Sequence, residues 1–120
     1  MEPARFYAVL SRMKYIGRWG LMRNTRQENL SEHSLEVAVI AHALALVRNV
    51  RFGGQVNAER AAVFGMLHDA PEILTGDLPT PVKYYNDEIK TAYRQVEQAA
   101  VEQLCALLPE DLKEAYKPLF

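Results

Sequence analysis

The chain has 120 residues, of which 49% are hydrophobic and 24% are charged. These values are typical of one soluble globular domain, here residues 1–120, whose core is small relative to its surface. Lys and Arg number 14 and Asp and Glu number 15. The net charge of -1 argues against a protein that coats a nucleic acid polymer, although it permits a pocket with one or two arginines.

The first predicted helix covers residues 3–14, because Phe6, Leu10 and Met13 are spaced by four and three. Residues 15–30 show no sustained amphipathic pattern and are expected to form a loop, with at most a short helix. Alternating apolar runs and Asn-Gly or Asp-Gly turns are absent from the sequence. Strand signals are therefore poor, and we expect an all-α fold.

A long second helix is expected from Asn29 or Ser31 to about Arg48. Asn29 is a good N-cap, and Glu32, three residues later, completes a capping box. One stripe of this helix should face the core: Leu35, Val39, His42 and Leu46. Because His42 shares that stripe, it reads as a core histidine or as a support behind a site.

The third predicted helix covers residues 58–70, with Asn57 as its N-cap. Pro71 cannot continue the backbone hydrogen bonding of that helix, so a kink or a restart is expected there. Residues 75–81 should form a turn-rich loop. Within it, Thr80 is expected to cap a further helix that has a proline at its first position.

Another long helix is predicted over residues 87–108. Its apolar residues recur at four-and-three spacing: Ile89, Tyr93, Val96, Ala100, Leu104 and Leu107. A final short helix should begin at Pro109 and end near Pro118.

Cysteine usage and hydropathy bear on the location of the protein. The single cysteine, Cys105, reads as a packed core thiol and can form no disulfide within the chain, which predicts a reducing, cytoplasmic location. The first residues open no signal peptide. No run approaches the roughly 20 apolar residues that span a bilayer, so no membrane association is expected.

Two of the 3 histidines are placed like metal ligands. His68 and Asp69 are adjacent, about 100° apart around a helix, so they can share a metal ion only near the seam between them. His33 lies in the first turn of another helix, where its side chain can face a cleft. A His-Asp pair is a common accident, so its surroundings decide how it is read.

The surroundings of this pair favour a site. Asp69 falls at the C-terminal end of a predicted helix, where the helix dipole disfavours a carboxylate unless a cation compensates it. Glu72 lies about one turn later, and Asp77 follows in the loop. A solvated face would usually alternate such groups with Lys or Arg.

Three segments together resemble a known family. They are Arg18-Trp19, the sequence ENLSEHS at residues 28–34 and the sequence HDAPEILTGDLPTPVK at residues 68–83. They are similar to the bacterial HD-domain 5′-deoxynucleotidases, a branch of the HD phosphohydrolase superfamily. The resemblance runs from about Phe6 to the last residue and implies an HD-type helical bundle.

The resemblance implies a chemical role for each matching residue. His33, His68 and Asp69 would bind a divalent cation such as Co²⁺, Mn²⁺ or Zn²⁺. Glu72 would be required for catalysis, by handling the proton of the attacking water. Arg18 would orient the 5′-phosphate, for which its planar fork of donors is suited.

The same resemblance implies how the nucleotide is held. Trp19 would shape the sugar pocket, which favours deoxyribose by crowding the 2′ position. The remaining residues implied to lie against the substrate are Asp77, Leu78, Pro79, Thr80, His33 and Asp69. By residue type alone, Trp19 equally suits core packing and Asp77 a turn, while Arg18 suits a solvated surface.

The implied reaction is hydrolysis of deoxyribonucleoside 5′-monophosphates to nucleoside and phosphate, carried out by a homodimer. One alternative is a related HD phosphohydrolase that acts on a triphosphate or cyclic nucleotide, which would need more cations at the phosphates than Arg18 and Lys83. Another is a non-catalytic helical module that binds a nucleotide or dimerises.

The family also uses a further metal-ligating Asp on a helix beyond residue 120. Asp87 and Asp111 do not match it and read as solvated residues at helix starts. We therefore expect a bundle that lacks its last helices. Apolar surface should be exposed on the helix over residues 87–108.

Overall fold

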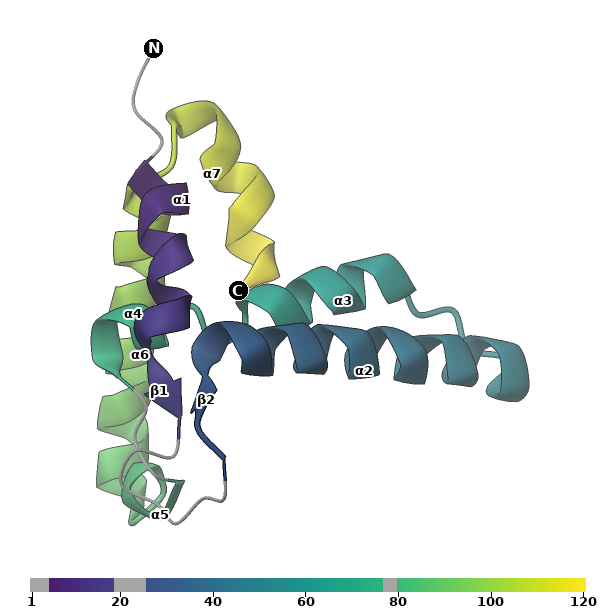
Figure 1. Cartoon of the computed structure of the whole chain (residues 1–120), viewed down its shortest axis with the longest axis horizontal. Coiled ribbons are helices and arrows are strands. Elements are labelled where there is room, and N and C mark those ends of the chain that lie inside the picture. The colour runs from purple at the N-terminus through teal and green to yellow at the C-terminus, as the bar shows by residue number, and fades with distance from the viewer. Residues whose placement is uncertain (1–4, 19–25, 77–79) are drawn as a thin grey trace.

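A computed structural model describes residues 5–18, 26–76 and 80–120. The helices form two parts that meet at a steep angle (Figure 1). One part is a column built from α1 (Arg5–Leu10), α6 (Asp87–Ala106) and α7 (Glu110–Tyr116). The other part is an arm in which α2 (Leu30–Phe52) and α3 (Ala58–Leu67) lie side by side.

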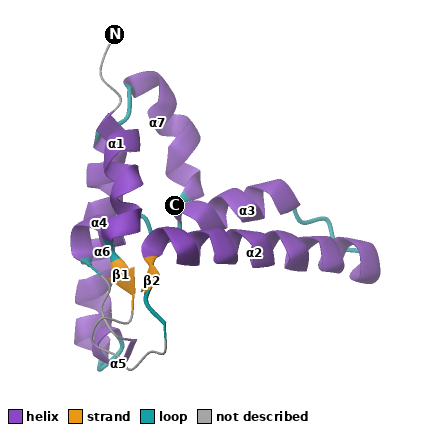
Figure 2. Ribbon diagram, viewed as in Figure 1, coloured by secondary structure: helices purple, strands orange, loops and turns teal. Residues whose placement is uncertain are grey.

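Helices dominate the described part of the chain, as the sequence predicts, but a small sheet is present as well (Figure 2). Strand β1 (Gly17–Arg18) pairs with β2 (Glu28–Asn29) in antiparallel register, with Arg18 opposite Glu28. Residue patterns in the sequence do not indicate this pair. Strands of two residues are too short to show the alternation by which strands are recognised in a sequence.

The first predicted helix is confirmed, although its last turn is the 3-10 helix Ser11–Tyr15. Phe6 of α1 is completely buried. The core around it combines residues from the column, the first residue of α2, the turn after α3 and helix α4: Met13, Leu30, Ala70, Ile73, Leu104 and Leu108. This small core therefore joins the start of α2 to the column.

Helix α2 begins as predicted. The Asn29 side chain accepts a hydrogen bond from the Glu32 amide, and the Glu32 carboxylate accepts one from the Asn29 amide. The helix ends at Phe52, four residues beyond the predicted Arg48, where Gly53 takes the left-handed conformation that glycine adopts readily (φ 67°).

The buried face of α2 is a different one from the face predicted. Leu35 is 64% exposed and Val39 is 61% exposed, and His42 on the same stripe is only half-buried. The face that packs on α3 carries small residues instead: Ser34, Ala38 and Ala45. The reason is the close approach of the two helices, since a Cβ atom at Gly65 of α3 would lie 2.9 Å from the Cα of Ala38.

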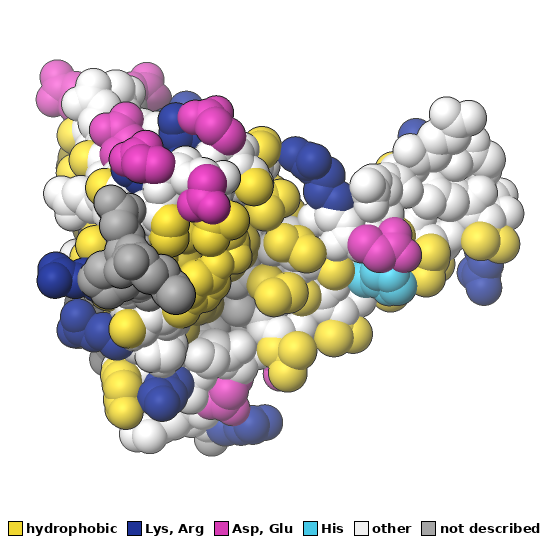
Figure 3. All heavy atoms as spheres, turned by 90° about the horizontal axis from the view of Figure 1, so that it is seen from above, with side chains coloured by type: hydrophobic (Ala, Val, Ile, Leu, Met, Phe, Trp, Pro, Cys, Tyr) yellow, Lys and Arg dark blue, Asp and Glu magenta, His cyan; other side chains and the backbone are white. Residues whose placement is uncertain are grey.

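The large apolar side chains of α2 lie on its outer faces. Exposed examples are Leu35, Val39, Ile40, Leu44, Leu46, Val47, Val50 and Phe52. Hydrophobic side chains also gather where the arm joins the column (Figure 3). By length and composition α2 could cross a membrane. The core helices of soluble proteins can meet the same criteria of length and composition. The expectation that no stretch reaches this level is therefore wrong for α2.

The chain after α3 turns sharply. α3 starts after its predicted cap Asn57, but it ends at Leu67, three residues short of the predicted end. The predicted restart at Pro71 is confirmed by α4 (Glu72–Thr75). Helix α5 (Thr80–Lys83) follows after residues 77–79, which lie outside the described residues.

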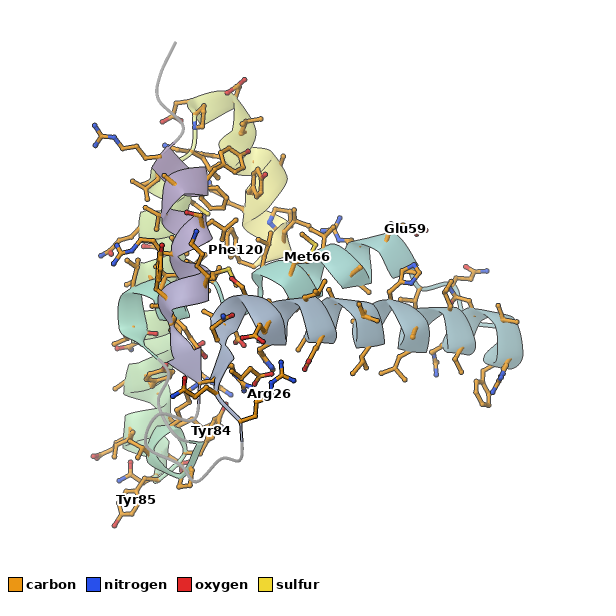
Figure 4. The ribbon with its side chains drawn as sticks, in the orientation of Figure 1. Arg26, Glu59, Met66, Tyr84, Tyr85 and Phe120 are labelled. Carbon is orange, nitrogen blue, oxygen red and sulfur yellow. The ribbon has the colours of Figure 1, made fainter. Side chains whose placement is uncertain are left out.

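The two C-terminal helices agree with the sequence. Asn86 caps α6, and Ala100 and Leu104 of its predicted stripe are buried, whereas Ile89 and Val96 are exposed. The predicted exposure of apolar residues on α6 is thus confirmed, although α2 has more exposed large apolar side chains. α7 is followed by the 3-10 helix Lys117–Leu119. Phe120 lies where the column approaches α3, while Tyr84 and Tyr85 lie at the far end of the column (Figure 4).

Candidate metal centre

Two helix ends meet at the junction of arm and column. The first turn of α2 carries His33, and the turn that follows α3 carries His68 and Asp69. α2 and α3 pack so closely at Ala38 and Gly65 that these two ends are held together. The structure thus brings together the three residues that the sequence singled out as metal ligands.

The geometry of the three side chains suits one metal ion. Asp69 Oδ2 lies 3.2 Å from Nε2 of His33 and 3.0 Å from Nε2 of His68. One ligand atom from each residue can be chosen so that all three lie within 4.8 Å of one another. Ligand atoms around a tetrahedral ion with bonds of about 2.1 Å are about 3.4 Å apart, so the spacing fits.

A backbone contact fixes the orientation of the His68 ring. Its Nδ1 lies 2.8 Å from the carbonyl oxygen of Gly65. When Nδ1 donates this hydrogen bond, the lone pair of the neutral ring is on Nε2, which faces Asp69. Metal-ligating histidines usually have such a partner on their other nitrogen.

The electrostatics of the cluster keep Asp69 ionised. Burial would raise the pKa of Asp69, but the hydrogen bond with His68 and the nearby positive charges outweigh it, so the pKa is lowered. The hydrogen bond that Nε2–H of the protonated ring donates to Asp69 raises the pKa of His68, and this proton must leave before Nε2 can bind a metal. Burial and the charge of Arg18 lower the pKa of His33, which favours the neutral, metal-binding form of that ring.

Glu72 lies at the start of α4, close to this cluster in the chain, and its side chain is only 11% exposed. Its Oε1 lies 3.5 Å from Nζ of Lys83 on α5. Lys83 in turn lies over the ring of Tyr93 on α6, 5.3 Å from the ring centre. Lys83 thus contacts the predicted catalytic carboxylate, a pairing that sequence spacing alone does not indicate.

Arg18 lies on β1, beside the start of α2, and its charge acts on both His33 and Asp69. Its Nη1 donates a hydrogen bond of 2.6 Å to Oε2 of Glu28 on β2. Sequence reasoning placed Glu28 in a matching segment without a role. The signal that could have found it is the opposite charge of the two residues across the strand pair.

Other predicted residues fall outside this cluster or outside the described residues. His42 does not belong to it. Asp87 and Asp111 are exposed in the first turns of α6 and α7, as predicted. Trp19, Asp77, Leu78, Pro79 and the side chain of Thr80 are not described. Their contacts with a nucleotide stay predictions.

Comparison with known proteins shows one consistent group. The YfbR-like family of 5′-deoxynucleotidases matches residues 5–120. A 5′-deoxynucleotidase from Vibrio vulnificus is 57% identical over 118 residues, which are 98% of this chain and 61% of that protein. The 5′-deoxynucleotidase YfbR from Escherichia coli is 56% identical over 99% of this chain and 60% of that protein.

The fold has a solved counterpart. A crystal structure of an HD-domain phosphohydrolase from Listeria innocua matches with a TM-score of 0.85 and 26% identity. The match covers all of this chain and 57% of that one. The predicted HD-type helical fold is therefore confirmed, and the chain spans about three fifths of the length of the curated relatives that it matches.

Proposed function

The chain belongs to the YfbR-like family of 5′-deoxynucleotidases, and from this premise we propose that it provides the metal-binding part of an enzyme that hydrolyses deoxyribonucleoside 5′-monophosphates. The observation that carries the proposal is the convergence of His33, His68 and Asp69, with ligand atoms within 4.8 Å. In the proposed reaction a water oxygen bonds to phosphorus and the bond from phosphorus to the 5′-oxygen breaks. The departing 5′-oxygen takes a proton.

The three converging side chains would hold a divalent cation, for which Co²⁺, Mn²⁺ and Zn²⁺ suit a mixed set of imidazole and carboxylate ligands. The chemistry supplied by such a cation is activation of water and partial neutralisation of the phosphate charge. Gly65 would fix the ring of His68 during this work through its carbonyl oxygen. The pKa of Asp69 is lowered despite its burial, so the carboxylate stays ionised at neutral pH.

Two further side chains would handle the proton and the phosphate. Glu72 would accept the proton of the attacking water, a role supported by its burial and its position one turn after Asp69. Arg18 would orient the phosphate with its planar donors. Trp19 would shape a pocket selective for deoxyribose. The segment Asp77, Leu78, Pro79 and Thr80 would contact the nucleotide, as the resemblance implies.

Phosphate release from dAMP, with AMP alongside, tests the proposal after the purified chain is loaded with Co²⁺ or Mn²⁺. We expect release from dAMP well above AMP and its loss in Glu72→Ala. A preference for nucleoside triphosphates would favour the related phosphohydrolase instead. No release from any nucleotide, from a folded sample, would refute catalysis by this chain and favour a non-catalytic module.

We further propose that the protein is a cytoplasmic homodimer that binds neither a nucleic acid polymer nor a membrane. The exposed apolar side chains of α2 are typical of a helix that packs against another protein surface, and a second copy of the chain could provide that surface. The buried Cys105, which can form no disulfide within the chain, supports a reducing compartment. The net charge of -1 supports a substrate with few phosphates over a polymer.

A further inference from the structure

The ion pair between Arg18 and Glu28 crosses the two-stranded sheet at directly opposed positions. Its N–O distance is 2.6 Å, and the two side chains are only 16% and 22% exposed. Such a short, charge-assisted bond between partly buried groups restrains both side chains. It differs in this respect from the ion pairs on the outer surface, such as that between Arg26 and Glu32, in which Arg26 is 80% exposed.

The backbone that carries this pair is tied to the metal centre. Leu30, the first residue of α2, donates a hydrogen bond of 2.8 Å to the carbonyl oxygen of Ile16, just before β1. On the other strand, Asn29 is the N-cap of α2. β1 and β2 therefore have a fixed position relative to the first turn of α2, which carries His33 (Figure 1).

The side chain of Arg18 is long, and an unrestrained arginine has many rotamers. A phosphate that binds an unrestrained guanidinium must bear the loss of that freedom, whereas a guanidinium already held in place loses less on binding. A guanidinium has five donors, so a planar cation whose Nη1 contacts a carboxylate can also bind an anion. Both Arg18 and Glu28 act on the pKa of His33, which supports their closeness to the centre.

We propose that Glu28 is a positioning residue, whose carboxylate holds the guanidinium of Arg18 in the orientation that binds the phosphate of the substrate. This inference rests on the proposed function, because it takes Arg18 as the phosphate ligand. For phosphate binding, a positioning role of Glu28 predicts the opposite effect to that expected from its negative charge alone. Removing an acid near an anion site should strengthen phosphate binding by charge alone, whereas removing a positioning acid should weaken it.

Binding of inorganic phosphate to the chain, followed by ³¹P NMR titration, tests this directly because it needs no turnover. We expect Glu28→Ala to raise the dissociation constant about tenfold, as for the loss of one ordered charged contact. In the Arg18→Ala background the same change should not weaken binding further. Glu110→Ala is the matched control, since Glu110 forms a 2.6 Å bond with Lys113 on the exposed start of α7.

Denaturation by urea shows whether each variant is folded. If Glu28→Ala does not fold, Glu28→Gln replaces it, and we then expect about a threefold loss of affinity that vanishes in the Arg18→Ala background. Unchanged or tighter phosphate binding in the Glu28 variant overturns the proposal. An equal loss of phosphate affinity from the Glu28 substitution with and without Arg18 also overturns it. The same holds if the unmutated chain binds phosphate no better than Arg18→Ala.

The hydrolysis of dAMP is measured separately on the same samples, which distinguishes the two ideas. Turnover by the unmutated chain, together with a Glu28 variant that binds phosphate normally, would leave the proposed function standing and refute the role of Glu28. Absence of turnover, together with the predicted pattern of phosphate affinities, would support Glu28 as the residue that orients Arg18 and refute catalysis by this chain.

Discussion

A Cβ atom at Gly65 would lie 2.9 Å from the Cα and 3.0 Å from the amide nitrogen of Ala38. The backbones of α3 and α2 are therefore in direct contact about one helical turn from their site-bearing ends. The Gly65 carbonyl oxygen also contacts His68 Nδ1. One residue thus sets both the spacing of the helices and the orientation of a predicted ligand.

Gly65→Ala should therefore destabilise the protein even though alanine is the better helix former. The added methyl group meets backbone atoms, which cannot move aside as the end of a side chain can, and overpacking of this kind costs about 1–3 kcal/mol. The free energy of unfolding by urea measures the effect. Gly17→Ala is the control, because a Cβ atom there meets no other atom within 4 Å. Equal stability of the two variants would contradict the close packing.

The N-cap of α2 should matter to the candidate metal centre as well as to stability. Asn29→Ala is expected to lose about 1 kcal/mol of stability, as is Asn86→Ala at the start of α6. Only Asn29→Ala should also weaken binding of Mn²⁺, because His33 lies in the turn that fraying would loosen. Calorimetric titration of both variants compares them. Weakened metal binding in both would point to a general loss of fold.

Lys83 should stabilise the partly buried carboxylate of Glu72. We expect Lys83→Met to lower the free energy of unfolding by about 1 kcal/mol, because the 3.5 Å ion pair lies between side chains with 18% and 11% exposure. Lys113→Met on the outer surface should lose less than about 0.5 kcal/mol, since its partner Glu110 is 81% exposed. Urea unfolding of both variants is the measurement. A smaller loss of unfolding free energy for Lys83→Met than for Lys113→Met would refute the pairing of Lys83 with Glu72.

The apolar outer face of α2 should control self-association. Leu44 is 64% exposed on that face, so Leu44→Lys is expected to lower the mass measured by light scattering toward that of one chain. Val82→Lys is the comparison, because Val82 is 50% exposed on the short helix α5. If the two variants have the same mass as the unmutated chain, a dimer formed through α2 is excluded.

Much of the helical framework could be predicted from residues with strong local preferences. Asn29, Asn57 and Asn86 cap helices in the structure, although only the first two were predicted as caps. The restart after Pro71 also follows from backbone chemistry that depends on neighbours in the sequence alone. Local rules of this kind give helix starts better than helix ends, and both α2 and α3 end away from their predicted residues.

The buried face of α2 could not be found by the same route. Periodicity assigns the largest apolar residues to the core, yet Leu35 and Val39 are exposed while Ala38 is buried. The deciding fact is the glycine at position 65, on another helix, which permits a close approach that only small residues fit. Likewise, the ligand set could be predicted from residue type and resemblance, but the partners of Arg18 and Glu72 depend on how distant segments fold together.

We propose above all that His33, His68 and Asp69 together bind one divalent cation. Calorimetric titration of the chain with Mn²⁺ or Co²⁺ tests it without requiring catalysis. We predict one ion per chain, a loss of about 100-fold or more in affinity in Asp69→Asn, and unchanged affinity in His42→Ala, which alters the histidine outside the cluster. Equal affinity in Asp69→Asn and the unmutated chain, or an equal loss in His42→Ala, would contradict binding of the cation by these three residues.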